Sequence, residues 1–289
     1  MARVSQPSRH LPRALRAPRW LVGQGDSLLQ RLGHQLSFLS QVIGAIPHTL
    51  RHYRHQTGVL LVDVMWGNGS LIVGGGTIGV LVFMGAAVGG AVGIEGYGAL
   101  DMVGMGPLTG FVSAYANTRE MAPMIAGIGF GAQAGCRMTA EIGAMRISEE
   151  IDALEALGIR SIPFVVTTRV IAGMLTIVPL YIVTLVLSYV SCALVVNVLH
   201  GQSSGTYNHY FSSFIQPSDV VLSVLKAAIF VTLIIVIHAY HGYYASGGPE
   251  GVGRASGRAI RASIVTVVAA DMVLTLLFWG NSAGIRISG

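Results

Sequence analysis

Charged residues are scarce in this sequence. Only 11% of its 289 residues are Asp, Glu, Lys or Arg, against roughly 25% in an average soluble domain. Hydrophobic residues make up 52% of the chain. A soluble fold of this size needs far more charge to cover its surface, so the composition excludes an ordinary water-soluble domain. The apolar surplus predicts side chains that face lipid.

Lysine is almost absent, and cysteine is rare. Lys226 is the single lysine and lies in Val-Leu-Lys-Ala, whereas a P-loop requires Gly-x-x-x-x-Gly-Lys so that its lysine reaches the phosphates. We therefore expect a non-catalytic chain that hydrolyses no ATP by that route. Cys136 and Cys192 lie in apolar stretches, without the spacing of a disulfide framework or a metal site. No cofactor and no metal ion are expected.

Arginine supplies the other cations, and its distribution predicts an orientation in a membrane. Eight arginines lie in residues 1–54, four in 137–169 and three in 254–261. With five spans and a cytoplasmic N-terminus, these 15 arginines face the cytoplasm, and only Arg119 and Arg286 lie outside. Cytoplasmic loops carry the excess of basic residues, so we expect a cytoplasmic N-terminus and a periplasmic C-terminus. The basic charge therefore requires no nucleic acid as a partner.

Long uncharged stretches predict an all-α, polytopic membrane protein with about five transmembrane helices. A span needs roughly 20 predominantly apolar residues. The expected spans are 69–93, 119–145, one within 170–218, 222–244 and 260–280.

The expected organisation around these spans has four parts. They are a basic, disordered cytoplasmic tail at 1–32, interfacial or elbow helices at 33–66, the transmembrane domain at 67–280 and a periplasmic tail at 281–289. Within 33–46, apolar residues at helical spacing predict an amphipathic helix that Pro47 ends. Residues 201–218 are expected to form a polar loop, and Gly247-Gly248-Pro249 to break the chain between the last two spans.

Residues 148–158 predict a short acidic helix on the cytoplasmic side. Ser148 is a favourable N-cap and Gly158 a favourable stop. The helix carries four acids and no base: Glu149, Glu150, Asp152 and Glu155. Its apolar face consists of Ile151, Leu154 and Leu157. An interfacial helix usually turns basic residues towards anionic lipid, so this one is expected to dock on a protein partner, with a solvated connector as the alternative.

Several charged residues fall within the expected spans, where charge is costly and usually functional. Arg119 and Glu120 lie where the second span meets the outer leaflet, either as a local ion pair or as the polar rim of a cavity for a lipid head group. Arg137 and Glu141 are four residues apart and can pair on one helix face, in a structural or gating role. Asp271 is expected to be hydrogen-bonded within the bundle.

Small residues recur at every fourth position in Gly127, Gly131 and Gly135. This spacing is typical of helices that pack closely in a membrane, either within the subunit or across a dimer. His238 and His241 lie three residues apart near the end of the fourth span. Because no further ligand accompanies them, they are expected at the membrane interface rather than at a metal ion.

Three motifs follow one another in residues 119–159: Arg-Glu-x-x-Pro at 119–123, Thr-Ala-Glu-Ile-Gly-x-Met-Arg at 139–146 and Glu-x-Ile-Asp-Ala-Leu-Glu at 149–155. They resemble the signature of the MlaE/YrbE permeases, the membrane subunits of Mce-type lipid ABC transporters. Segments 169–173 and 271–275 also fit, and the resemblance extends over roughly 55–280. Met121-Ala122, where the family often has Leu-Gly, and the long Arg-rich tail look more like the actinobacterial YrbE proteins, with a B-type subunit favoured.

The resemblance implies a transporter assembled from several chains. The permease dimerises, with a second YrbE-like permease favoured over a second copy, and two copies of a cytoplasmic ATPase dock on 148–158. Periplasmic MCE-domain proteins stand above it at the bacterial inner membrane, and the substrate is a fatty or mycolic acid, a phospholipid or a sterol. The family positions that match Arg119, Glu120 and Pro123 face the lipid pocket. The alternatives are an ATP-independent secondary transporter or channel, and a membrane anchor for periplasmic lipid-binding proteins.

Overall fold

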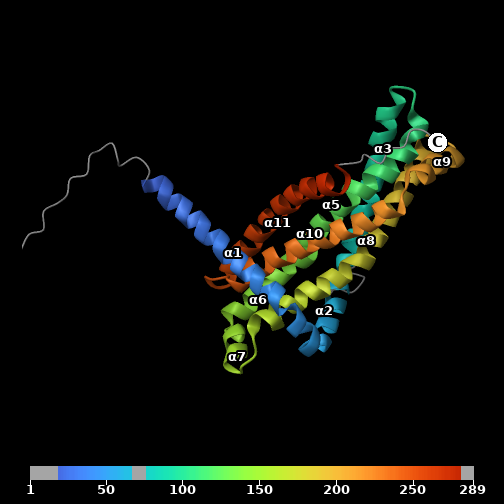
Figure 1. Cartoon of the computed structure of the whole chain (residues 1–289). Coiled ribbons are helices and arrows are strands. Elements are labelled where there is room, and N and C mark those ends of the chain that lie inside the picture. Colours follow the sequence, from blue (N-terminus) through green and yellow to red (C-terminus); the bar gives the residue numbers. More distant parts are fainter. Residues whose placement is uncertain (1–18, 67–75, 281–289) are drawn as a thin grey trace, which may run out of the picture.

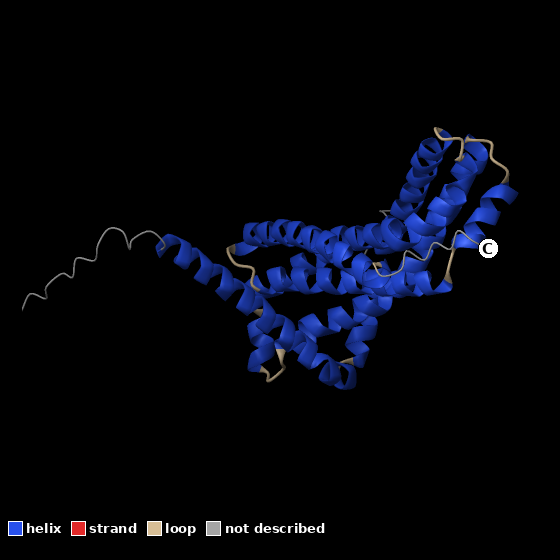
Figure 2. Ribbon diagram, turned by 45° about the horizontal axis from the view of Figure 1, so that its top comes forward, coloured by secondary structure: helices blue, strands red, loops and turns tan. Residues whose placement is uncertain are grey.

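The computed structural model describes residues 19–66 and 76–280. Residues 1–18 of the tail expected at 1–32, the tail expected at 281–289, and the beginning of the first expected span at 69–75 lie outside the described residues. Within the described ranges the chain consists of helices joined by short loops, without a strand (Figure 2). The prediction of an all-α fold is therefore confirmed.

Several of the long helices are divided by π-helical turns. In chain order the elements are α1 (Arg19–His52), α2 (Arg54–Trp66), α3 (Gly76–Asp101), η3 (Gly106–Leu108), α4 (Thr109–Val112), η4 (Ser113–Met121), α5 (Ala122–Phe130), η5 (Gly131–Gly135), α6 (Cys136–Ile147), α7 (Glu150–Ala156), η6 (Ile162–Thr167), α8 (Thr168–Leu194), η7 (Val195–Leu199), α9 (Ser204–Phe214), α10 (Pro217–Tyr243) and α11 (Gly248–Trp279). The long helices lie beside one another, with α2 and α7 at one end of the molecule and α9 at the other (Figure 1).

Among the described residues, four helices are long and apolar enough to cross a membrane: α3, the continuous run η6–α8–η7, α10 and α11. Their most apolar windows have mean hydropathies of 2.1, 2.5, 2.9 and 2.0. They correspond to the first, third, fourth and fifth expected spans. The break between α10 and α11 falls at Gly247 and Gly248, whose φ angles of 90° and 68° glycine adopts without strain.

The second expected span is helical but differs from these four. Residues 109–147 form one continuous run through α4, η4, α5, η5 and α6. Charged residues along this run lower its hydropathy, so it is not among the helices that are apolar enough by composition. It packs against α3, α10 and α11, which shield it from lipid. That residues 119–145 cross the membrane stays a prediction.

Close packing of this central run explains its glycines. At Gly127, Gly131 and Gly135 an added Cβ would lie 3.3, 3.4 and 2.9 Å from side chains of α10. The three glycines therefore face α10 of the same chain. α3 and α8 approach one another in the same way, because a Cβ at Gly89 would overlap the backbone of Ser188.

The N-terminal helix differs from its prediction at both ends. α1 begins at Arg19, inside the expected disordered tail, and continues through Pro47 to His52. A proline inside a helix removes one backbone hydrogen bond. The turn that follows is nevertheless held in place, since the buried Thr49 donates a hydrogen bond to the carbonyl oxygen of Pro163 (3.3 Å). Pro47 therefore does not end the helix, contrary to the prediction from the sequence.

The two faces of α1 have different surroundings. Phe38 and Val42 are buried, whereas Leu36 and Ile43 are 64% and 56% exposed. The ring of Phe38 packs edge-on against Tyr240 of α10. α1 thus lies across the bundle with one face attached to it and the other face open (Figure 1).

The segment expected as a polar loop, 201–218, contains the helix α9. Tyr207 of α9 is buried with Cys192 and Val196. α9 approaches α4 closely, since a Cβ at Gly110 would overlap the carbonyl oxygen of Tyr207. Burial also raises the pKa of the Tyr207 phenol, because it disfavours the charged phenolate. The segment is therefore a packed part of the fold rather than a solvated loop.

Candidate functional site

A group of charged side chains is buried between η4, α10 and α11. Its centre is Lys226, which has 0% of its side chain exposed and lies within α10, one of the four apolar helices. An isolated ammonium in such a place is very costly, so it requires partners. No expected site included Lys226, although a single lysine inside an apolar stretch is a signal that could have found it.

Lys226 is paired with carboxylates from two other elements. Its Nζ lies 2.7 Å from Oδ1 of Asp271 in α11 and 3.0 Å from Oε2 of Glu120 in η4. It also donates hydrogen bonds to Oγ1 of Thr275 and to the carbonyl oxygen of Arg119, both at 2.8 Å. Thr275 in turn donates to Oε1 of Glu120 (2.7 Å). Because an ammonium has three protons, the hydrogen bonds to Glu120, Thr275 and the carbonyl of Arg119 use its whole donor capacity. Asp271 therefore lies beside Lys226 as an ion pair, and its Oδ1 accepts no hydrogen bond, contrary to the expectation that Asp271 is hydrogen-bonded.

A second ion pair adjoins the first. Arg119 is 4% exposed and donates from Nε (3.0 Å) and Nη2 (2.7 Å) to Oδ2 of Asp219. Nε1 of Trp279 donates to the other carboxylate oxygen of Asp219 (2.9 Å). The Arg119 guanidinium also lies 4.0 Å from the centre of the Tyr115 ring, an attractive arrangement of a cation over an aromatic face. Arg119 thereby joins η4 to α10 and to the end of α11.

The local helix geometry explains how both residues come to face α10. Arg119 and Glu120 lie in the π-helical segment η4, directly before α5, which has Pro123 in its first turn. Proline lacks the N–H that would close the preceding α-helical hydrogen bond. A π-helical turn accommodates such an interruption, and π-helical turns are frequent at functional sites.

Glu120 is the accessible member of this cluster. Its side chain is 30% exposed, against 10% for Asp271, 4% for Arg119 and 0% for Lys226. Pro123 is buried. Of the three residues expected at the rim of a lipid cavity, only Glu120 therefore presents polar atoms to the outside. The cluster can bind an anionic group by exchange, in which the ligand replaces the Glu120 carboxylate at Lys226.

The acidic helix expected at 148–158 is present, with different ends. α7 spans Glu150–Ala156. Ser148 is not its N-cap, because its hydroxyl donates to a carbonyl in the last turn of α6 (3.0 Å) and so closes that helix. Glu149 precedes α7 with φ of 60°, a left-handed conformation that is uncommon outside glycine and that turns the chain sharply from α6 into α7. Gly158, with φ of 77°, follows α7 at the expected stop.

The apolar face of α7 is directed mainly into this chain. Ile151 is fully buried in the core of the bundle, and Leu154 is partly buried beside it. Neither side chain is free to enter a groove on a partner, contrary to the expectation for the whole face Ile151, Leu154 and Leu157. Leu157 is 77% exposed and is the one of the three that a partner can reach.

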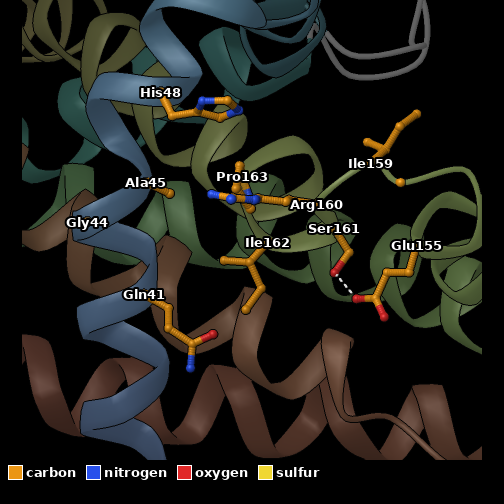
Figure 3. Close-up of a pocket in the computed structure, with 11 residues that line it drawn as sticks. Gln41, Gly44, Ala45, His48, Glu155, Ile159, Arg160, Ser161, Ile162 and Pro163 are labelled. Atoms are coloured by element: carbon orange, nitrogen blue, oxygen red, sulfur yellow. Dashed lines mark hydrogen bonds between the residues drawn. The ribbon is translucent and has the colours of Figure 1, made fainter.

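The acids of α7 are exposed, and three of them have partners within the chain. Glu150 accepts a hydrogen bond from Ser148 (3.0 Å). Asp152 pairs with Arg146 (2.7 Å). Glu155 accepts hydrogen bonds from Ser161, which Figure 3 shows, at 2.5 Å and from Tyr243 of α10 at 3.4 Å. Glu155 therefore fastens α7 to the beginning of η6 and to the end of α10.

A groove of about 610 Å³ lies beside Glu155, between α1 and the segment that leads from α7 into η6 (Figure 3). Gly44 and Ala45, two small residues of α1, line one side, and Arg160 lies on the other. The surface at this end of the molecule is therefore formed by α7 and α1 together.

Arg137 and Glu141 pair as expected (3.4 Å), within a larger network. Nη2 of Arg137 lies 2.7 Å from Oδ2 of Asp63 in α2. Arg169 of α8 lies 3.4 Å from the other oxygen of Glu141. Two cations and two carboxylates thus join α2, α6 and α8. Asp63 and Arg169 come from other helices, so the local spacing that identified the first pair could not identify them.

His238 is buried, which contradicts the expectation of an interfacial residue. Its Nδ1 lies 2.8 Å from Oγ1 of Thr139, and its Nε2 lies 3.4 Å from Oγ of Ser263. It is therefore a hydrogen-bonded residue of the core that links α6, α10 and α11. In residues 19–66 and 76–280, no group of His, Cys, Asp and Glu side chains could hold a metal ion.

The comparisons with known proteins concern most of this bundle. Residues 68–277 match the family described as Permease MlaE. A probable ABC transporter permease protein of Rickettsia bellii is 34% identical over 162 residues, which are 56% of this chain and 62% of that protein. The chloroplastic protein TRIGALACTOSYLDIACYLGLYCEROL 1 of Arabidopsis thaliana is 31% identical over 203 residues, 70% of this chain and 58% of that protein. The intermembrane phospholipid transport system permease protein MlaE of Haemophilus influenzae is 25% identical over 202 residues, 70% of this chain and 77% of that protein.

Proposed function

This chain belongs to the MlaE permease family, and from that premise we propose that it is the permease subunit of an Mce-type ABC transporter that moves lipid across a bacterial inner membrane. Its four apolar helices make it a multi-pass membrane protein. The relatives named as ABC transporter permeases support the transporter assignment, and the relative named as a phospholipid transport permease favours lipid as the substrate. ATP hydrolysis belongs to a separate chain, because this sequence has no P-loop lysine.

The observation that carries this proposal is the acidic helix α7 and its rigid attachment. Ile151 inserts into the core, and Glu155 is hydrogen-bonded to Ser161 and Tyr243. A force applied to α7 is therefore transmitted to α6, η6 and α10. Glu149 and Glu150 remain exposed and suit a basic groove on a cytoplasmic ATPase, because complementary charge guides association and fixes its register.

Co-purification with the ATPase tests this docking surface. The variants Glu150→Arg and Leu157→Asp change exposed side chains in α7 and directly after it, and the ATPase is expected to dissociate from both. Glu250→Arg is the matched control, since Glu250 is an acid with 82% of its side chain exposed in the first turn of α11, outside α7. Normal recovery of the ATPase with both α7 variants would refute the contact.

The proposed lipid site is the cluster around Lys226. A lipid phosphate is an anion like the Glu120 carboxylate and makes the same charge-assisted hydrogen bonds. It can therefore take the place of Glu120 at Lys226 and Thr275. Glu120 is the exposed partner and Lys226 the buried one, so this exchange brings the head group to the ammonium without moving the ammonium into hydrocarbon.

Lipid transport by Glu120→Gln tests the exchange. The amide keeps the size of the side chain but is a weaker partner for Lys226 than the carboxylate, so it does not displace a bound head group. Release of the lipid slows, and uptake is expected to fall by about tenfold or more, the equivalent of roughly 1.4 kcal/mol. The complex with the ATPase should remain intact on size-exclusion chromatography. Glu95→Gln is the control, because Glu95 is an exposed acid on α3. Unchanged uptake by Glu120→Gln would exclude the carboxylate from the lipid path.

The assembly proposed from the family resemblance has further members. They are a second YrbE-like permease, two ATPase copies and periplasmic MCE-domain proteins, with the N-terminus of this B-type chain in the cytoplasm. The test is to extract the tagged chain gently from its native membrane. Mass spectrometry then identifies these partners and any retained lipid. Recovery of the chain alone, stable and free of lipid across mild detergents, would favour a transporter that works without ATP.

A further inference from the structure

A separate groove lies on the outside of the bundle, between α1 and the pair α10 and α11. Its volume is about 360 Å³, within the roughly 300–1,000 Å³ typical of small-molecule sites. Leu36 and Leu39 of α1 form one wall, Leu233 and Val236 of α10 form another, and Ala262 of α11 lines the third side. The groove is mostly apolar, and it shares no residue with the Lys226 cluster or with α7.

One end of this groove is cationic. Ala262 and Thr266 line it on α11. Arg258 lies one turn earlier on the same stripe, because residues four apart share a helix face. Arg258 is exposed, and it is close enough to His241, which also lines the groove, for their charges to interact. An anion at this end of the groove therefore meets the Arg258 guanidinium.

The cationic end also carries the side chains of a membrane interface. Tyr240 lines the groove, and its hydroxyl lies 2.9 Å from Nδ1 of His34. Tyrosine is enriched at the level of the lipid head groups, where one end of its ring is apolar and the other is hydrated. The hydroxyl of Tyr243, three residues on, lies 2.7 Å from Oγ of Ser161, close to α7. The groove therefore opens at the α7 end of the bundle and runs along α10 towards Leu233.

We propose that this groove binds one anionic phospholipid from the leaflet at the α7 end of the bundle. The phosphate lies at Arg258, and one acyl chain lies between α1 and α10, against Leu39 and Val236. This acyl chain fills the space between α1 and the helices α10 and α11, so the bound lipid holds α1 in place. This site requires only that α10 and α11 span the membrane, and not the transport role proposed above.

Photo-crosslinking of the full chain in mild detergent tests the site. The probes are phosphatidylglycerol and phosphatidylcholine that each carry a diazirine in one acyl chain. Peptide mass spectrometry is expected to find phosphatidylglycerol attached to residues 36–39 of α1 and 233–237 of α10. Native mass spectrometry should show one retained phosphatidylglycerol, with a preference of about fivefold over phosphatidylcholine, since one arginine faces the head group.

Two pairs of variants separate this site from general contact with lipid. Arg258→Gln is expected to remove the preference for phosphatidylglycerol, whereas Arg254→Gln, one turn further from the groove, retains it. Ala262→Trp fills the groove and should remove the crosslinks, whereas Val265→Trp, at a position 70% exposed on α11, leaves them. If Ala262→Trp does not elute as a folded protein, the arginine pair decides. Equal capture of both lipids, or an unchanged preference in Arg258→Gln, would overturn the proposal.

Discussion

Lys226→Met is expected to destabilise the protein by about 3–5 kcal/mol, the usual cost of removing one partner from a buried ion pair. Methionine keeps the apolar stem of the side chain and removes only the ammonium. Asp271 and Glu120 then face one another without a cation between them, and the carbonyl oxygen of Arg119 loses a donor. Three elements, η4, α10 and α11, lose the group that joins them.

The upper part of this range applies because Lys226 and Asp271 are both buried, although Glu120 is partly exposed. The side chain of Lys226 is 0% exposed and that of Asp271 is 10% exposed. Few water molecules can therefore replace the ammonium beside the Asp271 carboxylate. A change of 1 kcal/mol shifts the melting temperature of a chain of 150–250 residues by roughly 2–4 °C. For this slightly longer chain we expect a decrease on the order of 10 °C. Adding Asp271→Asn removes the stranded carboxylate, so the double variant should recover part of that decrease.

The chain contains its own reporter of unfolding. Cys192 is fully buried, so a thiol-reactive fluorescent dye labels it only when the bundle opens on heating in detergent. Cys136 is partly exposed and is replaced by alanine in every protein that is compared. Leu225→Met is the matched control, because Leu225 is the neighbouring residue on α10 and is 47% exposed.

Two results would refute this reasoning. One is a melting temperature of Lys226→Met that differs from that of the reference protein by less than about 2 °C. Such a difference is smaller than the shift that a change of 1 kcal/mol in stability produces. The other is a double variant, Lys226→Met with Asp271→Asn, that melts lower than Lys226→Met alone. Either outcome would mean that the ammonium is not what holds the two carboxylates in the bundle.

Two further predictions concern packing. Gly89→Ala forces a Cβ into the backbone of Ser188 and is expected to cost about 1–3 kcal/mol in the same thermal assay. Gly98→Ala, where nothing lies within 4 Å of the added Cβ, should not destabilise, and equal melting of the two would contradict close packing of α3 on α8. Ile151→Ala is expected to cost about 2–5 kcal/mol and to speed proteolysis around α7, while Leu157→Ala leaves the cleavage rate unchanged. Equal cleavage of both variants would show that Ile151 does not anchor α7.

Features that depend on neighbours along the chain could be predicted from the sequence. The apolar runs identified α3, α8, α10 and α11, because a membrane span is recognised by length and hydropathy alone. The break at Gly247 and Gly248 was also recognisable, since two glycines before a proline disfavour a continued helix. Arg137 and Glu141 were predicted to pair for the same reason, because residues four apart lie on one helix face.

Features that depend on which helices meet could not be predicted in this way. Lys226 is separated by more than a hundred residues from Glu120 and by more than forty from Asp271. Their contact depends on how η4, α10 and α11 are turned about their own axes, which hydropathy does not determine. The apolar face of α7 was recognised from the spacing of its residues along the chain. That spacing does not determine whether the face packs on another protein or on the rest of the same chain, as Ile151 does.

The two ends of the proposed mechanism lie on one continuous element. The run of helix from Arg119 to Ile147 extends about 40 Å at 1.5 Å per residue, roughly the thickness of a bilayer with its head groups. It begins at the Lys226 cluster, passes the Arg137 network and ends at the turn into α7. A partner that moves α7 therefore acts on the same helix that carries Glu120. Within this run η5 is a π-helical segment, and such segments weaken the regular hydrogen-bond ladder. If η5 bends and absorbs a displacement at α7, Glu120 stays paired with Lys226. If the whole run moves as one body, Glu120 separates from Lys226. Lipid exchange at this site requires that separation.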